Sequence, residues 1–219
     1  MSYKVVHLSS AHSTFDVRIF QKECVSLSNA GYNVILVIPS KDYQESEGVQ
    51  VRGIKNSSNR LERFLFRSYK AYKRALKEDG DVYHFHDPEL MLYGVILAKK
   101  GKKVIYDVHE NLLGQILHKN WIPYFFRPTV KKIIEIIESY AIPHYSGIVV
   151  TDNYLKDKYE DFNVNVVDVL NYPILEEFKG QVNLDTSRYR QSKIVNFGGV
   201  REDRVASNII ASFNLIDSN

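Results

Sequence analysis

The chain has 219 residues, of which 44% are hydrophobic and 25% are charged, and its formal net charge is +3. This composition supports a sizeable core and does not indicate a nucleic-acid partner. The single cysteine, Cys24, excludes a disulfide framework within the chain and favours a reducing compartment.

The first residues run directly into an apolar strand, without the basic flank and apolar core of a signal peptide. No stretch approaches the roughly 20 consecutive apolar residues that a membrane-spanning helix needs. We therefore expect a cytoplasmic protein.

Short apolar runs alternate with helical stripes along most of the chain. Gly31 and Gly101 end two of the predicted helices, and Pro88 begins another. In chain order the predicted elements are strand 4–8, helix 16–30, strands 33–38 and 49–54, helix 61–76, strand 82–86, helix 88–100, strand 103–108, helical region 112–141 with breaks at Pro123 and Pro128, strand 147–150, helix 153–159 and strand 164–170. This alternation predicts an α/β fold, with a doubly wound, mostly parallel, Rossmann-like sheet and helices on both faces.

The composition changes after Phe178. Residues 179–192 are polar and have no clear period, so we interpret them as a linker. A new unit then follows in residues 193–219, with strand 193–197, loop 198–204 and helix 205–216. We expect one domain over residues 1–178 and a truncated second domain. Because the apolar stripe of the last helix would otherwise be exposed, we also expect residues 193–219 to pack on their own domain or to form a homodimer.

Three polar clusters each follow a predicted strand. They are Ser9-Ser10-Ala11-His12 with Asp16 and Arg18, then His86-Asp87-Pro88-Glu89, and then Asp107-Val108-His109-Glu110-Asn111. In an open parallel sheet the carboxyl ends of the strands face one crevice, where ligands bind. The three clusters therefore predict a single site.

The order and spacing of these motifs resemble the N-terminal half of a two-domain (GT-B) glycosyltransferase of the retaining family 4. The later segment Phe197-Gly198-Gly199-x-x-x-Asp203-Arg204 resembles the opening of that family's donor-binding domain. The resemblance implies an acceptor on the N-terminal domain, a nucleotide sugar on the C-terminal domain and chemistry in the cleft between them. Val205 stands where the family usually has glycine, and the rest of the donor domain is missing. The isolated chain is therefore expected to transfer no sugar.

The resemblance implies that His109 is the catalytic histidine beside the transferred sugar. The residues expected to bind the acceptor are Ser10, His12, Asp16, Arg18, His86, Asp87, Glu110 and Asn111, and those expected to bind the donor phosphates are Gly198, Gly199 and Arg204. The implied partners are a nucleotide-sugar donor, which is a substrate rather than a cofactor, and a glycan or lipid-linked acceptor. No cofactor is expected, and the first strand is not followed by the G-x-G-x-x-G motif of dinucleotide-binding folds.

Several of these residues have a second interpretation. Asp16 can cap the first helix, and Glu110 and Asn111 can cap the helix after them. His84 and His86 alternate on one strand and project to the same face, where zinc with His109 or Asp87 is an alternative. No metal site is predicted, because catalytic zinc needs three converging ligands.

Two further surfaces have open interpretations. A basic stripe on helix 61–76 is either a solvated face or a contact with anionic lipid at the inner membrane face. The segment 121–127 is aromatic and is either a lid on the core or a second membrane contact. The stripe residues are Arg63, Arg67, Lys70, Arg74 and Lys77.

Two other functions compete with sugar transfer. A nucleotide-sugar epimerase shares the two-domain architecture, and a truncated, non-catalytic acceptor-binding module would explain the missing donor half. Isomerisation of a nucleotide sugar without an acceptor would identify the epimerase.

Overall fold

The computed structural model describes residues 2–40, 44–55, 66–117, 119 and 121–175. Contacts divide the chain into two units, Met1–Asn171 and Tyr172–Asn219, and nearly all of the second unit lies outside the described residues. The predicted linker, the last strand, loop and helix, and the homodimer contact therefore remain predictions.

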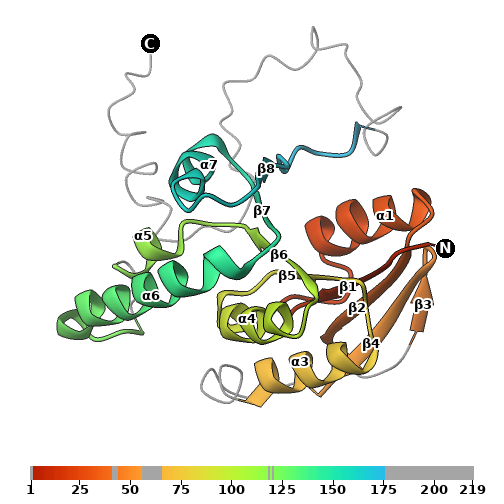
Figure 1. Cartoon of the computed structure of the whole chain (residues 1–219), viewed down its shortest axis with the longest axis horizontal. Helices are drawn as coiled ribbons and strands as arrows, with labels where there is room; N and C mark the ends of the chain where they lie inside the picture. Colours follow the sequence, from red (N-terminus) through yellow and green to blue (C-terminus); the bar gives the residue numbers. More distant parts are fainter. Residues whose placement is uncertain (1, 41–43, 56–65, 118, 120, 176–219) are drawn as a thin grey trace, which may run out of the picture. The chain divides into compact units, whose positions relative to one another are not determined.

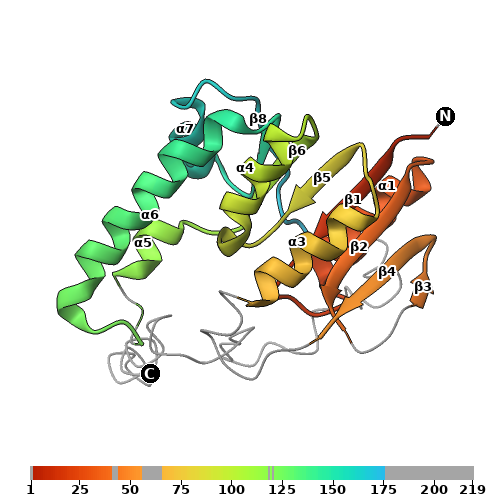
Figure 2. The same cartoon turned by 60° about the horizontal axis from the view of Figure 1, so that its bottom comes forward.

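Eight described strands form one sheet, in the order β3-β4-β2-β1-β5-β6-β7-β8 (Figures 1 and 2). All neighbouring strands are parallel except β3 and β4, which confirms the predicted doubly wound α/β fold. The strands are β1 (Lys4–Leu8), β2 (Asn33–Pro39), β3 (Gln44–Ser46), β4 (Val49–Ile54), β5 (Val82–Phe85), β6 (Lys103–Val108), β7 (Gly147–Val150) and β8 (Val166–Asp168). The strand order reverses direction between β1 and β5, so the switch point of the sheet lies there.

Helices cover both faces of the sheet (Figure 1). On one face, the π-helical segment η1 (Val17–Cys24) continues into α1 (Val25–Asn29), and Ile19, Phe20 and Cys24 pack on the apolar side chains of β2 and β4. The other face holds the larger core. It lies under α3 (Ser68–Lys77), α4 (Met91–Lys99), α6 (Arg127–Ala141) and α7 (Asn153–Glu160).

The remaining elements are short. They are η3 (Pro88–Leu90), α5 (Leu112–Ile116), η4 (Tyr124–Phe126) and η5 (Ile142–His144). The predicted helical region 112–141 is thus broken near both prolines, and Pro128 sits in the first turn of α6, where a missing N–H costs nothing. None of the described helices combines the length and apolar character needed to cross a bilayer.

The structure differs from the sequence prediction at two elements. The predicted helix 16–30 begins with a π-helical segment, and Val17, which was expected on its apolar face, is 50% exposed. The short antiparallel strand β3 was not predicted, because its Gln-Glu-Ser sequence lacks an apolar pattern. The start of the predicted helix 61–76 lies outside the described residues.

One glycine allows the larger core to close. A Cβ added at Gly94 on α4 would lie 2.8 Å from Cε1 of Phe85 and 3.0 Å from Cε1 of Tyr145. Both rings are buried, so the helix approaches β5 this closely only without a side chain at that position.

Candidate functional site

The candidate site lies at the switch point, where β1 and β5 end side by side. Leu8 and Phe85 are paired in register as the last residues of these strands. Ser9 and Ser10 follow β1, His86 and Asp87 follow β5, and all four residues are buried. The first two polar clusters of the sequence are therefore brought together, as the carboxyl ends of neighbouring parallel strands require.

Asp87 joins these two clusters. Its Oδ2 accepts hydrogen bonds from the Ser9 hydroxyl at 2.7 Å and the Ser10 backbone N–H at 2.6 Å. Its Oδ1 lies 3.3 Å from His12 Nδ1. Burial alone would raise the pKa of Asp87, but the interactions with His12, Ser9 and Ser10 outweigh it and lower the pKa to about 2. Asp87 is therefore ionised, and it holds the turn after β1.

Asp107, near the end of β6, is the second buried carboxylate. Arg18 donates two hydrogen bonds to it, from Nε to Oδ2 at 3.0 Å and from Nη2 to Oδ1 at 2.7 Å. His86 Nδ1 and His109 Nε2 lie 3.0 and 2.6 Å from Oδ2. Because an ionised carboxylate only accepts, both histidines donate to it, which assigns a proton to His109 Nε2. In the neutral imidazole Nδ1 of His109 is then an acceptor.

The charge on Asp107 is stabilised by these donors. Burial would raise the pKa of Asp107, but hydrogen bonds from His109, His86 and Arg18 hold it well below its usual range. Burial lowers the pKa of His86, against the opposing effect of Asp107, so His86 is a neutral donor. The bidentate contact with Arg18 is the geometry that guanidinium and carboxylate groups prefer.

Two histidines face the accessible edge of the site. The side chains of His12 and His109 are 28% and 20% exposed, and their ring centroids are 5.2 Å apart. Burial opposes protonation of His12, but its hydrogen bond to Asp87 and the charge of that carboxylate raise its pKa. Each partly exposed imidazole is thus held by its own buried carboxylate, His12 by Asp87 and His109 by Asp107.

Three residues that sequence reasoning did not place in the site lie behind Asp107. They are His7 on β1, His84 on β5 and Glu23 on η1. Burial lowers the pKa of His84 to about 3 and that of His7 well below its usual range. Burial, followed by the charge of Asp107, raises the pKa of Glu23 to about 10. The in-register pairing of His7 with His84 is a tertiary feature that no sequence spacing reveals.

The other predicted site residues either cap helices, lie exposed or fall outside the described residues. Asp16 caps η1 by accepting from the backbone N–H groups of Arg18 and Ile19, and its charge also acts on His12. Asn111 caps α5, and the exposed Glu110 accepts a hydrogen bond from Gln115. The capping interpretation of Asp16 and Asn111 thus describes their contacts. The predicted donor-phosphate residues, Gly198, Gly199 and Arg204, lie outside the described residues.

The structure corrects the predicted basic stripe on helix 61–76. Arg67 is buried and donates from Nη1 to the backbone oxygen of Ser10 at 2.8 Å, so it supports the site instead of facing solvent. Arg74 forms an ion pair with Glu78 at 3.0 Å. Of the other stripe residues, Lys70 and Lys77 are exposed, and Arg63 lies outside the described residues.

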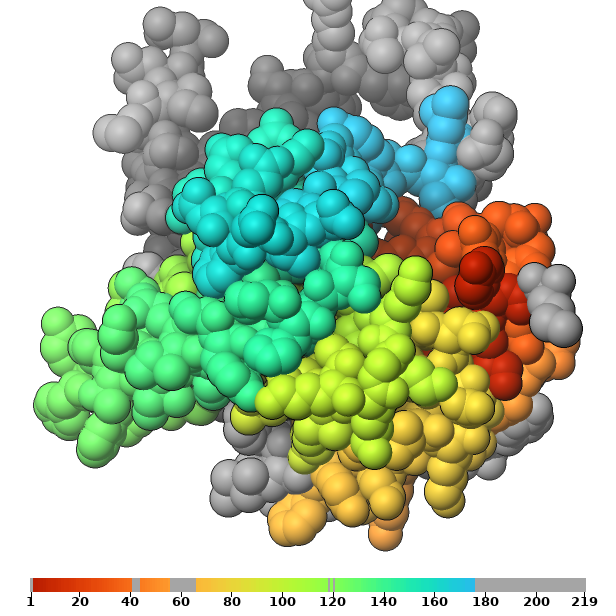
Figure 3. Space-filling model, viewed as in Figure 1, coloured from red at the N-terminus to blue at the C-terminus, as the bar shows by residue number. Residues whose placement is uncertain are grey.

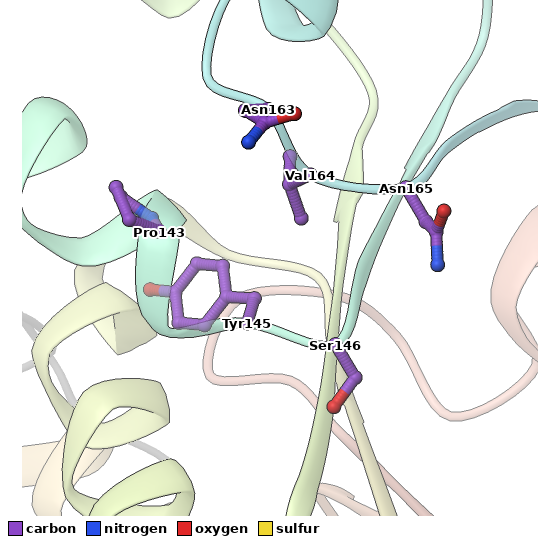
Figure 4. Close-up of a pocket in the computed structure, with 6 residues that line it drawn as sticks. All are labelled: Pro143, Tyr145, Ser146, Asn163, Val164 and Asn165. Atoms are coloured by element: carbon purple, nitrogen blue, oxygen red, sulfur yellow. The ribbon is translucent and has the colours of Figure 1, made fainter.

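A pocket of about 310 Å³ lies at the opposite end of β7 (Figure 4). Tyr145 and Ser146 line it just before β7 begins, and residues 163–165 line it before β8. It lies at the amino ends of the strands, away from the clustered histidines and carboxylates. It is therefore separate from the candidate site.

Comparison with known proteins agrees with this architecture. The family model described as Glycosyltransferase Family 4 matches residues 18–171. A sucrose-phosphate synthase from Thermosynechococcus elongatus aligns over 84% of this chain and 53% of its own, with a TM-score of 0.55 and 14% identity. The apo form of UGT2 from Phytolacca americana aligns over 82% of this chain and 55% of its own, with a TM-score of 0.50 and 10% identity.

The chain thus spans about half the length of these solved structures. At such low identities the structural likeness establishes the fold, which is that of a GT-B N-terminal domain. No curated protein sequence matches the chain.

Proposed function

The chain is a member of glycosyltransferase family 4, and we propose that it forms the acceptor-side half of an enzyme that transfers a sugar from a nucleotide sugar to a glycan or lipid-linked acceptor with retention. In this proposal the crevice after β1, β5 and β6 receives the acceptor. The donor is held by a second α/β domain, of which residues 193–219 are the beginning.

The observation that carries the proposal is the fixed position of His109 at the carboxyl ends of the strands, on the accessible edge of the site. Asp107 holds its Nε2 at 2.6 Å, so Nδ1 is left to accept a hydrogen bond from a hydroxyl of the transferred sugar or of the acceptor. His12 and Asp87 lie on the other side of the same edge. We infer catalysis by positioning and electrostatics, because the described part of the site presents no activated side-chain nucleophile.

Acceptor binding tests the proposal directly. Titration of a panel of glycans and lipid-linked oligosaccharide analogues into the purified chain, followed by calorimetry or ligand-observed NMR, is expected to identify a ligand. His109→Ala and His12→Ala should each lower the affinity for that ligand by roughly tenfold, as loss of one hydrogen bond in a buried site does. His144→Ala removes a histidine from η5, outside the site, and is the matched control.

The outcomes separate the competing functions. Glycan binding without turnover of any nucleotide sugar supports an acceptor-side half that requires the donor domain. Isomerisation of a nucleotide sugar without an acceptor would identify the epimerase. Glycan binding that is unchanged in both His12→Ala and His109→Ala would show that the acceptor does not bind at this site.

We further propose that the acceptor is presented at an anionic membrane surface. Aromatic residues in and before η4 are strongly exposed, with Phe125 at 80% and Tyr124 at 78%. This segment and the start of α6 project from the neighbouring elements (Figure 3). Lys131 and Lys132 follow on α6 and share one carboxylate partner, Glu135, so a net positive charge remains there to attract anionic lipid.

Vesicle sedimentation tests this surface. The chain should bind phosphatidylglycerol vesicles more strongly than neutral phosphatidylcholine vesicles, and the double variant Tyr124→Ser, Phe125→Ser should lose most of that binding. Tyr3→Ser changes an aromatic residue of similar exposure elsewhere and should bind like the unchanged chain. Equal binding by the double variant would assign these aromatics to another role.

A further inference from the structure

A compact group of buried ligand-type side chains lies between the sheet and η1, behind the candidate site. His7 on β1 and His84 on β5 are paired in register, with ring centroids 4.6 Å apart. His86 projects to the same face as His84, because strand side chains alternate. Glu23 lies at the same place, on the last turn of η1. One ligand atom from each of these four residues lies within 4.8 Å of the others.

Three members of this group have buried polar atoms without a hydrogen-bond partner. These atoms are Nε2 of His7, Nε2 of His84 and both oxygens of Glu23, whose raised pKa indicates a neutral carboxyl group beside the charge of Asp107. Arg18 Nε is 3.1 Å from Glu23 Oε1, but its N–H is directed to Asp107. Buried polar groups in proteins are nearly always satisfied, so this concentration of unsatisfied polar atoms requires an explanation.

The hydrogen-bond chain shows which atoms of the histidines are lone pairs. His86 Nδ1 donates to Asp107, so its Nε2 must accept. His7 Nδ1 lies 3.0 Å from that Nε2 and is therefore the donor. The Nε2 of neutral His7 is then an unprotonated nitrogen. A metal-binding histidine is typically arranged this way, with one nitrogen free and the other donating to a fixed partner.

We propose that His7, Glu23 and His84 form a zinc site, which His86 supports through its hydrogen bond to His7. Two neutral imidazoles and one carboxylate are a known ligand set for zinc, and imidazole favours zinc over magnesium or calcium. Because the raised pKa of Glu23 keeps its carboxyl group protonated, zinc binding would release that proton to solvent. Tetrahedral bonds of about 2.0–2.1 Å place ligand atoms about 3.3 Å apart, so the side chains must draw together around the ion. His7 Nδ1, the donor to His86, lies 4.0 Å from Glu23 Oε2, and Nε2 of the same ring must come within bonding distance of the ion. The bound ion would tie η1, which carries Arg18, to β1 and β5.

Two of the three ligands, His7 and Glu23, were not candidates from the sequence. There, His84 and His86 were combined with Asp87 or His109, and no third converging ligand could be identified. In the structure Asp87 bonds the turn after β1, and His109 bonds Asp107. The two ligands that join His84 instead come from β1 and η1. The proposal is independent of the sugar-transfer function.

Zinc binding to the full chain is the test. The chain is stripped with a chelator, titrated with ZnCl₂ by calorimetry, and analysed for metal content after gel filtration. The expected result is about one zinc per chain. Glu23→Gln and His84→Asn should each weaken zinc binding by at least about 100-fold, because loss even of a supporting group costs 10–100-fold. Cobalt substitution should give the visible absorption of a tetrahedral site, lost in both variants.

Two control variants keep the test specific. His109→Ala alters the neighbouring group of His86, Asp107 and His109, and His144→Ala removes a histidine from η5; both should retain stoichiometric zinc. Circular dichroism checks that each variant is folded. If a ligand variant fails to fold, the unchanged chain still decides the question, since zinc must raise its melting temperature. Absence of stoichiometric zinc, absence of that rise, or loss of zinc in His109→Ala would each overturn the proposal.

Discussion

Replacement of Asp87 by asparagine tests the energetics of the candidate site. The pKa of Asp87 falls from an ordinary 3.8 to about 2, because the hydrogen bonds from His12, Ser9 and Ser10 outweigh the effect of burial. A shift of nearly two pH units corresponds to about 2.5 kcal/mol of stability carried by the ionised form. Asp87→Asn keeps the shape but places an N–H₂ group beside the donors of Ser9 and Ser10. We expect a loss of about 2–3 kcal/mol at pH 7.

The stability difference between the two proteins should depend on pH. A carboxyl with a lowered pKa stabilises the folded state above its unfolded pKa, and this contribution is lost as pH falls from about 4 to 2. Urea unfolding of both proteins from pH 7 to pH 2 should therefore show a difference that shrinks toward zero. The control is Asp79→Asn, which alters an exposed ion pair at a position with φ of +48° that asparagine tolerates, and it should show no resolvable change. A difference that stays constant down to pH 2 would refute an origin in the charge of Asp87.

Three further predictions concern the same framework. Arg18→Met leaves Asp107 buried without its guanidinium partner and should cost about 3–5 kcal/mol in urea unfolding, whereas Arg74→Met at the surface should cost less than about 1 kcal/mol. Gly94→Ala should cost about 1–3 kcal/mol, because its Cβ meets the buried rings of Phe85 and Tyr145; a neutral or stabilised variant would contradict this. The imidazole of His12, followed by NMR, should titrate above its ordinary pKa of 6.5 in the unchanged chain and lower in Asp87→Asn; an identical midpoint in both would show that Asp87 is not responsible.

Most of the fold could be predicted from the sequence, because parallel strands buried on both faces appear as continuous apolar runs. The run at residues 33–38 is the clearest case and became β2. The polar edge strand β3 carries no such pattern. The π-helical geometry of η1 also cannot be predicted from the local sequence. Its i→i+5 hydrogen bonds depend on how Asp16 and the sheet hold the segment.

The candidate site was likewise predictable only where the local sequence carries a pattern. Ser10, His12, Asp87 and His109 could be proposed because each follows an apolar run. Glu23 could not, because an α-helix would place it about 140° around the axis from Arg18, whereas the π-helical turn directs both side chains to Asp107.

His7 was also missed, since a histidine within an apolar strand is indistinguishable from a core position until the register of the sheet is known. Its partner, His84, lies 77 residues away in the sequence, and only the parallel pairing of β1 with β5 brings the two rings together. The residues that directly follow the strands were therefore predictable from local sequence, while the residues packed beneath them were not.

The two halves of the site share one construction, which explains how buried charge is tolerated there. Asp87 follows β5 and Asp107 lies next to the last residue of β6, and each orients one partly exposed histidine. The charge of Asp87 is stabilised by His12 and by donors from Ser9 and Ser10, whereas the charge of Asp107 is stabilised by Arg18 and two histidines. Because burying one partner without the other is costly, the position of His109 depends on η1 being docked on the sheet. Any ligand that fixes η1, including the proposed zinc ion, therefore also fixes the histidine at the edge of the crevice.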